Sequence, residues 1–458
     1  MTNIKDLIKV QKNFFYSGST LPLKARKQHL KTLKRALIEM EDEFLQALHQ
    51  DFQKPEFESF ISETGYLIKD IDHMLSYLPD WVGRKRVSGS LLSFPSKSYI
   101  YHEPYGVCLI ISPWNYPLQL AIAPAIGALA AGNTVVIKPS ELAPATSAAL
   151  KNLAHKYFTP EVLAVVEGAV PETQELLEQP VDYLFFTGSP QVGKIMMKAA
   201  AEQLLPLTLE LGGKSPCIVD KTANLKIAAK RLAQGKFFNC GQTCIAPDYV
   251  LIDKSIQDQF VDELKKHIHT FYGDDPKKSD SYARVINHKH WQRLVGYLKD
   301  GHIEIGGEFS EAEKYIAPTV MTNVTKDSPV MQDEIFGPIL PIIAYSDESE
   351  IVPFIRQYSK PLALYHFTTN KKLRESILKN VSFGGGVVND TLEHLINPEL
   401  PFGGVGVSGI GAYHGEYSFK TFSHEKSVLQ KSSWFDLPLK YPPYDGKLKL
   451  LRNLFKIS

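Results

Sequence analysis

One of the four cysteines stands in a run of residues that suits a reactive thiol. Small and polar residues surround Cys244 in FFNCGQTCIAP, directly after a predicted helix. A thiol becomes nucleophilic when it is accessible and when a helix N-terminus or a cation lowers its pKa. We therefore predict that Cys244 is a nucleophile. Cys108 and Cys217 lie in apolar strands and are predicted to be packing residues. Cys240, one predicted helical turn earlier, is more simply a packing residue than half of a redox pair.

A carboxylate is predicted to lie where a general base is needed. Glu210 ends an apolar strand in the run LELGGK, next to the pair Gly212-Gly213. Desolvation at such a position raises the pKa of a carboxyl group toward the range of a general base. The plain alternative is a partly exposed glutamate at the end of a strand.

An amide follows another predicted strand. Asn115 lies in SPWNYP, just after the apolar run 106–112. Open α/β sheets bind ligands at the carboxyl ends of their strands, and an amide placed there can donate to a developing oxyanion. The alternative is an ordinary turn closed by the Asn side chain.

A turn that suits a phosphate follows the strand predicted at 182–188. The turn contains Gly188, Ser189 and Gly193 and leads into a helix, whose first N–H groups can bind an anion. The spacing G-x-x-x-x-G is neither the dinucleotide fingerprint nor a P-loop, because no Ser or Thr follows Lys194. Lys138 and Glu141, after the strand 134–138, suit a ribose or are simply charges at the start of a helix.

The elements that position these residues alternate between strands and helices. Apolar runs at 106–112, 134–138, 162–168 and 182–188 predict buried strands, and 118–131 predicts a buried helix. Helical crossovers imply parallel pairing, so 100–210 is predicted to form a doubly wound α/β domain. Ser140 is the predicted N-cap of the helix after the second strand.

The rest of the chain predicts a second α/β domain and two smaller segments. Two strand-like runs flank Gly212-Gly213, and helices are predicted at 223–238 and 256–272. The first eighty residues have a helical pattern, and the basic stretch 83–90 is predicted to be a solvated turn. The tail 441–458 is basic and amphipathic, which suits peripheral contact with an anionic membrane, a cap over a substrate funnel, or packing on a protein surface.

Composition excludes several classes of protein. The 458 residues carry 51 Lys and Arg against 50 Asp and Glu, so no basic field attracts nucleic acid. Four cysteines are too few for a secreted disulfide framework, their spacing suits no zinc site, and no metal is expected. The N-terminal residues lack the apolar core of a signal peptide, and the apolar stretch 120–131 is too short to span a bilayer. We expect a cytoplasmic protein, with any membrane contact peripheral.

The motifs taken together resemble one family. The ordered series PWNYP, KPSE, FFTGS with VGK, LELGGK, FFNCGQTC, EIFGP and PFGG is similar to the NAD(P)-dependent aldehyde dehydrogenase superfamily, over about residues 10 to 430. The segment 401–426 resembles its class-3 branch. The resemblance implies an α/β fold with two doubly wound, Rossmann-like domains and a small β arm.

The resemblance also implies how the chain divides into domains. Residues 1–80 and 100–210 would bind the cofactor, and residues 211–419 would carry the catalytic thiol. Residues 81–99 and 420–440 would form the bridging arm that joins two subunits of a homodimer. Residues 441–458 would form the separate basic tail.

The resemblance assigns the catalytic roles residue by residue. Cys244 matches the catalytic thiol, and Asn115 matches the oxyanion donor that acts with the N–H of Cys244. Glu210 matches the base that activates the thiol or the hydrolytic water. Glu334 matches the residue that holds the nicotinamide ribose, and in the class-3 branch it is an alternative base.

The remaining matches concern NAD or NADP. Lys138 and Glu141 match contacts to the adenosine ribose, and the phosphate turn matches Gly188, Ser189 and Gly193. Phe336 and Trp114 match residues of the nicotinamide site. Glu141 would repel a 2′-phosphate and favour NAD, whereas Lys138 would tolerate the phosphate, so either nucleotide is expected.

The expected reaction is oxidation of an aldehyde to a carboxylic acid through a thiohemiacetal and a thioester on Cys244. Medium- or long-chain aliphatic and aromatic aldehydes are the expected substrates. An acylating, coenzyme-A-dependent enzyme and a cysteine esterase are the alternatives. A non-catalytic binding protein is disfavoured, because it would be expected to have lost its nucleophile or its base.

Overall fold

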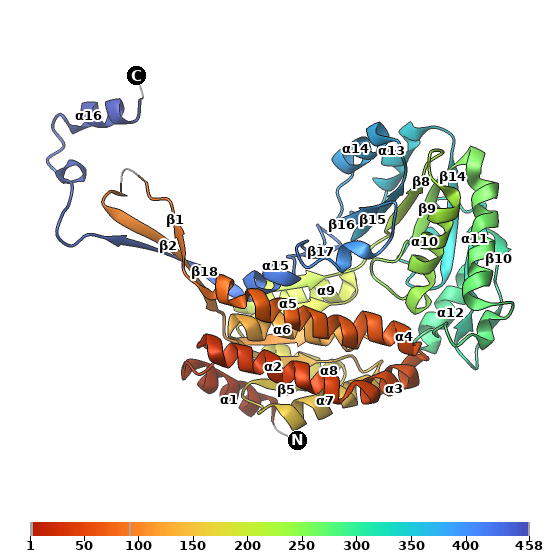
Figure 1. Cartoon of the computed structure of the whole chain (residues 1–458), viewed down its shortest axis with the longest axis horizontal. Coiled ribbons are helices and arrows are strands. Elements are labelled where there is room, and N and C mark those ends of the chain that lie inside the picture. Colours follow the sequence, from red (N-terminus) through yellow and green to blue (C-terminus); the bar gives the residue numbers. More distant parts are fainter. Residues whose placement is uncertain (1–2, 91–92, 457–458) are drawn as a thin grey trace.

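The computed structural model describes residues 3–90 and 93–456. Residues 91–92 of the predicted bridging segment and 457–458 of the predicted tail lie outside these ranges. Two α/β units lie side by side, and a narrow arm projects from them (Figure 1). This agrees with the predicted fold class of two doubly wound units and a small β arm.

The first unit contains a six-stranded sheet in the order β17-β7-β6-β3-β4-β5. Its strands are parallel except for β17, which pairs antiparallel with β7. The strand bounds are β3 Val107–Ile111, β4 Thr134–Lys138, β5 Leu163–Val165, β6 Tyr183–Thr187, β7 Leu207–Glu210 and β17 Gly409–Ile410. The strands predicted from the apolar runs are confirmed.

Helices cover both faces of this sheet. Along β3, Cys108 and Ile110 pack into one apolar cluster, whereas Val107 and Leu109 pack into another on the opposite face. Burial on both faces explains why the strands are continuously apolar. The helices of this unit are α1 Ile4–Tyr16, α2 Leu23–Glu39, α3 Glu41–Phe52, α4 Glu56–Ser59, α5 Gly65–Val82, α6 Gln119–Ala131, α7 Pro144–Tyr157, α8 Val170–Glu178 and α9 Pro190–Gln203, with a π-helical turn at Phe60–Thr64.

The helix caps agree with the sequence in one case and not in another. Gly132 ends α6 in the left-handed conformation, with φ 95°, as expected for a glycine stop. Ser140 is not the N-cap of α7, because that helix starts later, at Pro144. The carboxylate of Asp51, at the end of α3, instead accepts hydrogen bonds from the N–H groups of Ala145 and Thr146, each at 2.9 Å.

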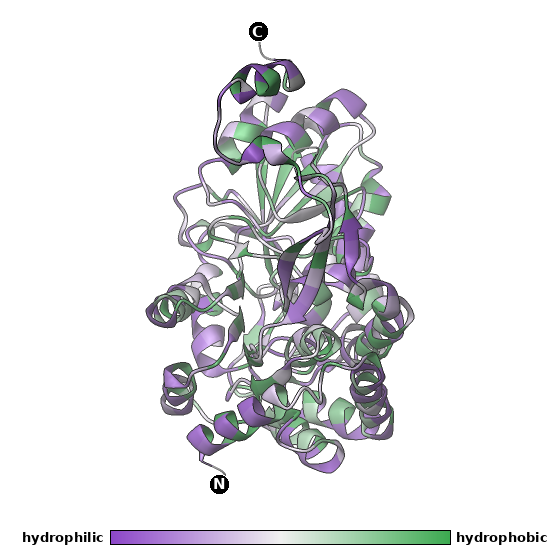
Figure 2. Ribbon diagram, turned by 90° about the vertical axis from the view of Figure 1, so that its left-hand side faces the viewer, coloured by the Kyte–Doolittle hydropathy of each residue, from purple (hydrophilic) through white to green (hydrophobic). Residues whose placement is uncertain are grey.

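The second unit contains a seven-stranded sheet in the order β10-β13-β14-β9-β8-β15-β16. It is parallel except for β10. Its strands are β8 Pro216–Val219, β9 Tyr249–Asp253, β10 His302–Ile305, β13 Thr319–Thr322, β14 Ile339–Tyr345, β15 Ala363–Phe367 and β16 Gly385–Val388. Its helices are α10 Leu225–Phe237, α11 Gln257–Tyr272, α12 His288–Tyr297, α13 Ile351–Ile355 and α14 Lys371–Asn380, and β11 Phe309–Ser310 pairs with β12 Tyr315–Ile316. Helix α15 Gly415–Thr421 instead packs on α5 and α6 of the first unit. In Figure 2 the strands inside the two units are largely green, whereas the outer helices show purple faces, so apolar residues concentrate at the two large sheets.

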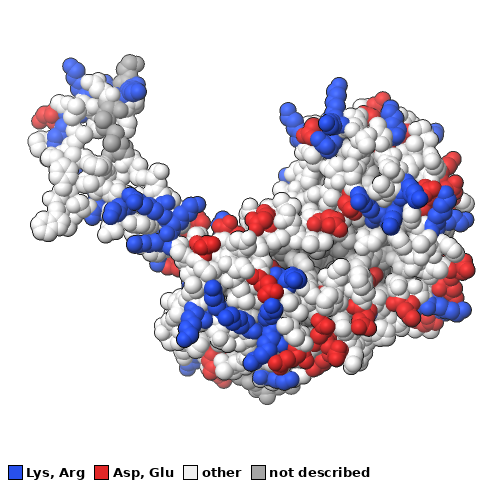
Figure 3. Space-filling model, viewed as in Figure 1, with Lys and Arg blue, Asp and Glu red and all other residues white. Residues whose placement is uncertain are grey.

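The arm is an antiparallel sheet of three strands, β1 Lys85–Val87, β2 Ser96–Pro104 and β18 Ser423–Lys431. The prediction that 83–90 is only a solvated turn is therefore wrong, because Lys85 to Val87 pair with Ser98 to Ile100. Lys and Arg side chains gather along the arm (Figure 3), and Arg84, Lys426 and Lys431 are among its exposed cations.

The tail ends in a short helix, α16 Lys447–Leu454, which lies beyond the arm. Its Leu448 and Leu450 are exposed, at 61% and 58%. Among the described residues, no helix combines the length and the apolar character needed to cross a bilayer.

Candidate active site

A mostly apolar pocket brings the predicted nucleophile and the predicted base together. Cys244 and Glu210 both line it, with Tyr116 and Thr243 beside them. The apolar part of the wall comes from segments that lie far apart in the chain: Ile61, Leu120, Leu211, Phe238, Ile245, Leu362, Leu392, Leu395, Ile396 and Phe402. Gln119, Gln234 and Glu393 supply polar positions. The sequence motifs did not indicate which residues form this wall, because they lie far apart along the chain.

The loop that carries Cys244 begins with an unusual reversal of the backbone. Helix α10 ends at Phe237, and Asn239 and Cys240 follow with φ of 54° and 55°, in the left-handed region. Cys240 and Cys244 are therefore not separated by a helical turn, which corrects the sequence-based expectation. Asn is among the residues that tolerate this conformation best.

Asn239 holds the reversal in place by bonds to distant segments. Its N–H donates to Glu58 Oε2 at 2.8 Å, and its side-chain amide donates to the carbonyl oxygens of Asn115 at 2.9 Å and Gln242 at 3.2 Å. Sequence reasoning assigned no role to Asn239. Its place inside the FFNCGQTC motif is the signal that could have found it.

Asn115 is 2% exposed and lies against the same loop. Its Nδ2 donates to the carbonyl oxygen of Gln242 at 3.0 Å. A primary amide has two N–H donors, so this bond fixes the side chain while using only one of them. Because Gln242 lies two residues before Cys244, the amide is tied directly to the thiol loop.

A buried ion pair supports the same region from behind. Lys54 Nζ lies 2.5 Å from Glu63 Oε1, and both side chains are fully buried. The ammonium group also lies 4.1 Å from the centre of the Tyr116 ring, whose hydroxyl is 2.6 Å from Thr243 Oγ1. The contact thus connects Lys54 to the residue that precedes Cys244. Neither Lys54 nor Glu63 stands in a motif, so the sequence gave no indication of this role.

The electrostatic environment of Cys244 differs from the expectation. Cys244 is half-buried, and desolvation raises the pKa of its thiol, as do the nearby carboxyl groups of Glu334 and Glu210. The backbone N–H groups of Cys244 and Ile245 lower this pKa, but by less than burial and the carboxyl groups raise it. The pattern of small and polar neighbours predicted a lowered pKa. In the free protein the thiol therefore needs a base to remove its proton.

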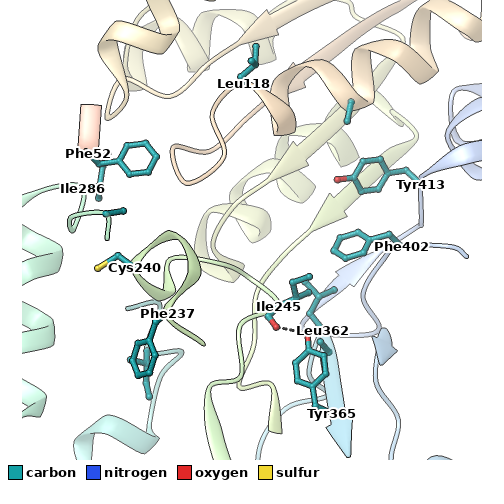
Figure 4. Packing of buried hydrophobic residues seen from close by; sticks show 14 of the residues in the cluster. Phe52, Leu118, Phe237, Cys240, Ile245, Ile286, Leu362, Tyr365, Phe402 and Tyr413 are labelled. Atoms are coloured by element: carbon teal, nitrogen blue, oxygen red, sulfur yellow. Dashed lines mark hydrogen bonds between the residues drawn. The ribbon is translucent and has the colours of Figure 1, made fainter. Parts of the chain in front are cut away.

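Figure 4 shows how the cysteine loop is packed on its two sides. Tyr365 donates from its hydroxyl to the carbonyl oxygen of Ile245 at 2.6 Å, which anchors the residue after Cys244. Cys240 lies on the other side near Phe237, is fully buried, and contacts the hydroxyl of Tyr282 at 3.7 Å. Cys108 and Cys217 are also buried, as predicted.

Glu210 is 2% exposed at the end of β7, and neither of its carboxyl oxygens has a hydrogen-bond partner among the described residues. Burial raises the pKa of this carboxyl group well above its ordinary range. A buried polar group without a partner is costly. Burial in the pocket thus favours the protonated form of this carboxyl group, which becomes a base once it loses its proton.

Glu334 lies against the Gly212-Gly213 pair. A β-carbon at position 212 would collide with the carboxyl group of Glu334, so only glycine permits this approach. Burial and the charge of Asp248 raise the pKa of Glu334 to about 8, and the N–H of Gly213 acts to lower it. Two residues on, the Phe336 ring meets Trp114 edge to face, with centroids 5.4 Å apart.

The other predicted cofactor residues lie at the carboxyl ends of two strands of the first sheet. At the end of β4, Lys138 Nζ lies 3.1 Å from Glu141 Oε2. After β6, Ser189 is the N-cap of α9, and its Oγ accepts from the N–H of Val192 at 3.4 Å.

Two glycines shape the turn after β6. Gly188 donates its N–H to the carbonyl oxygen of Glu210 at 3.0 Å, and Gly193 packs so closely on Leu211 that a β-carbon would overlap it. The turn, the Lys138–Glu141 pair and the pocket therefore lie along one edge of the sheet.

Comparison with known proteins provides an independent result. The family model described as "Aldehyde dehydrogenase family" matches residues 2–428. The chain is 48% identical over 447 residues to "4,4'-diaponeurosporen-aldehyde dehydrogenase" of Staphylococcus aureus, covering 97% of each chain. It is 45% identical over 450 residues to "Aldehyde dehydrogenase, dimeric NADP-preferring" of Rattus norvegicus, covering 98% of this chain and 99% of that protein. The solved structure "Substrate bound state of Staphylococcus Aureus AldH" superposes with a TM-score of 0.97 at 47% identity, covering 99% and 100%.

Proposed function

The chain belongs to the aldehyde dehydrogenase family, in its class-3 branch, and we propose that it oxidises lipophilic aldehydes to carboxylic acids through a covalent intermediate on Cys244. The observation that carries the proposal is that Cys244 and Glu210 open into the same apolar pocket. A thiol and a carboxyl group that line one apolar pocket suit an apolar substrate with one reactive carbon.

In the first step the thiol adds to the aldehyde carbon. Its proton passes to the carboxylate form of Glu210 or Glu334 and from there to solvent, and the carbonyl oxygen gains the negative charge. The second N–H of the Asn115 amide and the N–H of Cys244 stabilise that oxyanion. Such donors act strongly in a desolvated site, because they are fixed before charge develops.

When bound, NAD or NADP accepts the hydride, which converts the thiohemiacetal on Cys244 into a thioester. Glu210 then takes a proton from a water molecule as that water adds to the thioester carbon. The carbon–sulfur bond breaks, the acid leaves, and Cys244 recovers its proton. Dividing the oxidation between a thiol step and a water step is the advantage of covalent catalysis.

Several features of the protein fit a dinucleotide. The N-terminus of α9, with Ser189 as its cap, offers N–H groups for a phosphate. Exposed apolar side chains on the same helix, Val192 at 38% and Ile195 at 58%, suit an adenine ring. Glu334, held against Gly212, would hold the nicotinamide ribose, and the paired Phe336 and Trp114 rings would flank the nicotinamide.

The Lys138–Glu141 pair would meet the adenosine ribose, and it suits both nucleotides. A 2′-phosphate would draw Lys138 away from Glu141, whereas a 2′-hydroxyl would donate to Glu141. The rat relative is named NADP-preferring, which supports use of NADP by this chain as well.

The substrate class follows from the pocket wall. Ten apolar residues line it, and the staphylococcal relative is named for 4,4'-diaponeurosporen-aldehyde. We therefore propose medium- or long-chain aliphatic or aromatic aldehydes. The specificity constant for straight-chain aldehydes should increase with chain length, because each buried CH₂ contributes about 0.8 kcal/mol.

A direct assay tests this function. Nucleotide reduction is followed with aldehydes of increasing chain length, with NAD and NADP separately, and with and without coenzyme A. Free acid as the product in the absence of coenzyme A supports the proposal. Acyl-coenzyme A as the main product would favour the acylating enzyme. Cleavage of activated esters with no nucleotide reduction by any aldehyde would favour the esterase.

The arm supports a proposal about assembly. Nearly every residue of β18 is exposed, and Leu429 is 50% exposed. A strand that is exposed along its length at the edge of a sheet is a common site of association. The rat relative is named dimeric, and we propose a homodimer joined through the arm. Light scattering after size-exclusion chromatography should give twice the chain mass.

A further inference from the structure

The lysine that ends the LELGGK run has no part in the proposed reaction, yet its ammonium group is buried. Lys214 is 5% exposed, and its Nζ donates to Asp248 Oδ2 at 2.5 Å, to the carbonyl oxygen of Asp333 at 2.9 Å and to that of Val330 at 3.2 Å. An ammonium group has three N–H donors, so each of them has an acceptor.

Asp248 extends these connections. Its second carboxyl oxygen accepts from the N–H of Ile335 at 2.8 Å, and its own N–H donates to the carbonyl oxygen of Ser215 at 2.8 Å. Lys214 follows Glu210 by four residues, and Asp248 follows Cys244 by four. The ion pair therefore joins the segment of the base, the segment of the thiol and the loop that carries Glu334.

The loop is held on both sides of Glu334. Asp333 is bound by Lys214 and Ile335 by Asp248, and Arg293 of α12 donates from Nη2 to the carbonyl oxygen of Ile335 at 2.8 Å. The carboxyl group of Glu334 lies close against Gly212, in space that a β-carbon at that position would occupy. A small shift of this backbone would move the carboxyl group away from the site proposed for the nicotinamide ribose.

A contribution to the stability of the fold does not by itself explain the buried ion pair of Lys214 and Asp248. Desolvation of two buried charges offsets most of their attraction, and replacing both partners by apolar residues of similar size is often neutral or stabilising. A geometric role is the better explanation, because the pair binds three backbone groups of one loop with fixed directions.

We propose that Lys214 and Asp248 are positioning residues that fix the loop Glu334–Phe336 for binding of the nicotinamide nucleotide. This inference rests on the proposed function. Neither side chain is assigned a contact with the aldehyde or the nucleotide, so their removal acts through Glu334 and the loop that carries it. The expected consequence is a weaker hold on the nucleotide, with a smaller effect on the thiol chemistry.

The test uses Asp248→Asn, which leaves the Lys214 charge without its counter-ion, and the double variant Lys214→Met with Asp248→Leu, which removes both charges. The matched control is Asp220→Asn. Asp220 Oδ2 lies 3.2 Å from His366 Nε2 in a pair of side chains that are each 1% exposed, between β8 and β15 of the same sheet. That pair does not hold the Glu334 loop.

Nucleotide binding is measured by quenching of tryptophan fluorescence with NAD and with NADP, alongside the Tm, the KM for each nucleotide and kcat. The Kd and KM for nucleotide should rise about tenfold or more in both test variants, which corresponds to about 1.4 kcal/mol. They should change by less than about twofold in the control, even if its Tm falls. The double variant keeps the test valid if Asp248→Asn does not fold.

Two outcomes would overturn the inference. The first is an unchanged nucleotide Kd in a folded test variant. The second is an equal loss of binding in Asp220→Asn, which would make the effect one of general stability. A wild-type chain that neither binds nor reduces a nicotinamide nucleotide would instead refute the proposed function.

Discussion

The side-chain amide of Asn115 donates to the carbonyl oxygen of Gln242 at 3.0 Å. This bond links the loop between β3 and α6 to the loop that carries Cys244. The two residues are separated by 127 positions in the chain. In return, Asn239 donates its side-chain amide to the carbonyl oxygen of Asn115. The proposed oxyanion donor and the proposed nucleophile are thus held by the same reciprocal bonds.

Replacing Asn115 by Ala should reduce kcat by about 10²–10³, because one donor to the developing oxyanion is lost. Nucleotide binding should persist, since the Lys138 and Ser189 positions are untouched. Steady-state kinetics and fluorescence titration measure the two effects. Asn152→Ala, on the outer side of α7, is the control. Full turnover in a folded Asn115→Ala variant would remove this residue from the mechanism.

Cys244→Ser should abolish reduction of NAD or NADP while the protein still binds the nucleotide, since an alcohol is a far weaker nucleophile than a thiolate. Cys240→Ala is the matched control, because this cysteine is fully buried and contacts Tyr282 instead of the pocket. Turnover is measured by the absorbance of the reduced nucleotide at saturating aldehyde. Substantial turnover by Cys244→Ser, or equal loss in the control, would overturn the choice of nucleophile.

Glu210→Gln should slow steady-state turnover more than the first burst of hydride transfer, because the base is proposed to act on the water that cleaves the thioester. Stopped-flow and steady-state measurements on one preparation separate the two rates. An equal reduction in both would mean that Glu210 activates the thiol, and a normal steady state would transfer the role to Glu334.

The pH dependence follows from the same carboxyl group. Burial raises the pKa of Glu210 above its ordinary range, so the basic form is scarce at low pH and becomes more abundant as the pH rises. In wild-type protein kcat should therefore increase with pH through that raised pKa. The variant Glu210→Gln should lose this rise, and a rise retained in full would assign the titration to Glu334, whose pKa is about 8.

The choice between NAD and NADP should respond to Glu141. Glu141→Gln removes a negative charge beside the proposed 2′-position and leaves Lys138 without its 3.1 Å partner. The kcat/KM for NADP should therefore increase relative to that for NAD. The carboxyl group is 46% exposed, so the effect is modest, about two- to fivefold in the NADP to NAD ratio of kcat/KM. Lys138→Met should move that ratio the other way, and Glu175→Gln, on the exposed side of α8, is the control.

The sequence predicts the strands well because most of them are buried on both faces. The runs around Leu109, Val136 and Leu184 are continuously apolar, and each is a strand of the first sheet. The strand ends also carry Asn115 and Glu210, so their place at one edge of the sheet follows from the α/β rule.

The features that the sequence does not predict depend on residues far apart in the chain. The raised pKa of Cys244 arises from burial and from the carboxyl groups of Glu334 and Glu210, and only folding brings about both conditions. The same is true of the left-handed Asn239, which is fixed by Glu58 across 181 positions. The role of Glu334 could be predicted only from the family resemblance. The motif EIFGP by itself does not indicate that Glu334 lies against Gly212.

The cap of α7 gives a prediction about stability. Asp51 accepts from Thr146 Oγ1 at 2.8 Å and from two N–H groups of the first turn, whereas Ser140 only closes a turn to Leu142 at 3.2 Å. Asp51→Ala should therefore lower the free energy of unfolding by about 1–2 kcal/mol, measured as a lower urea midpoint, with little change in kcat. Ser140→Ala should have the smaller effect. A larger loss in Ser140→Ala would mean that the local serine, and not the distant carboxylate, begins the helix.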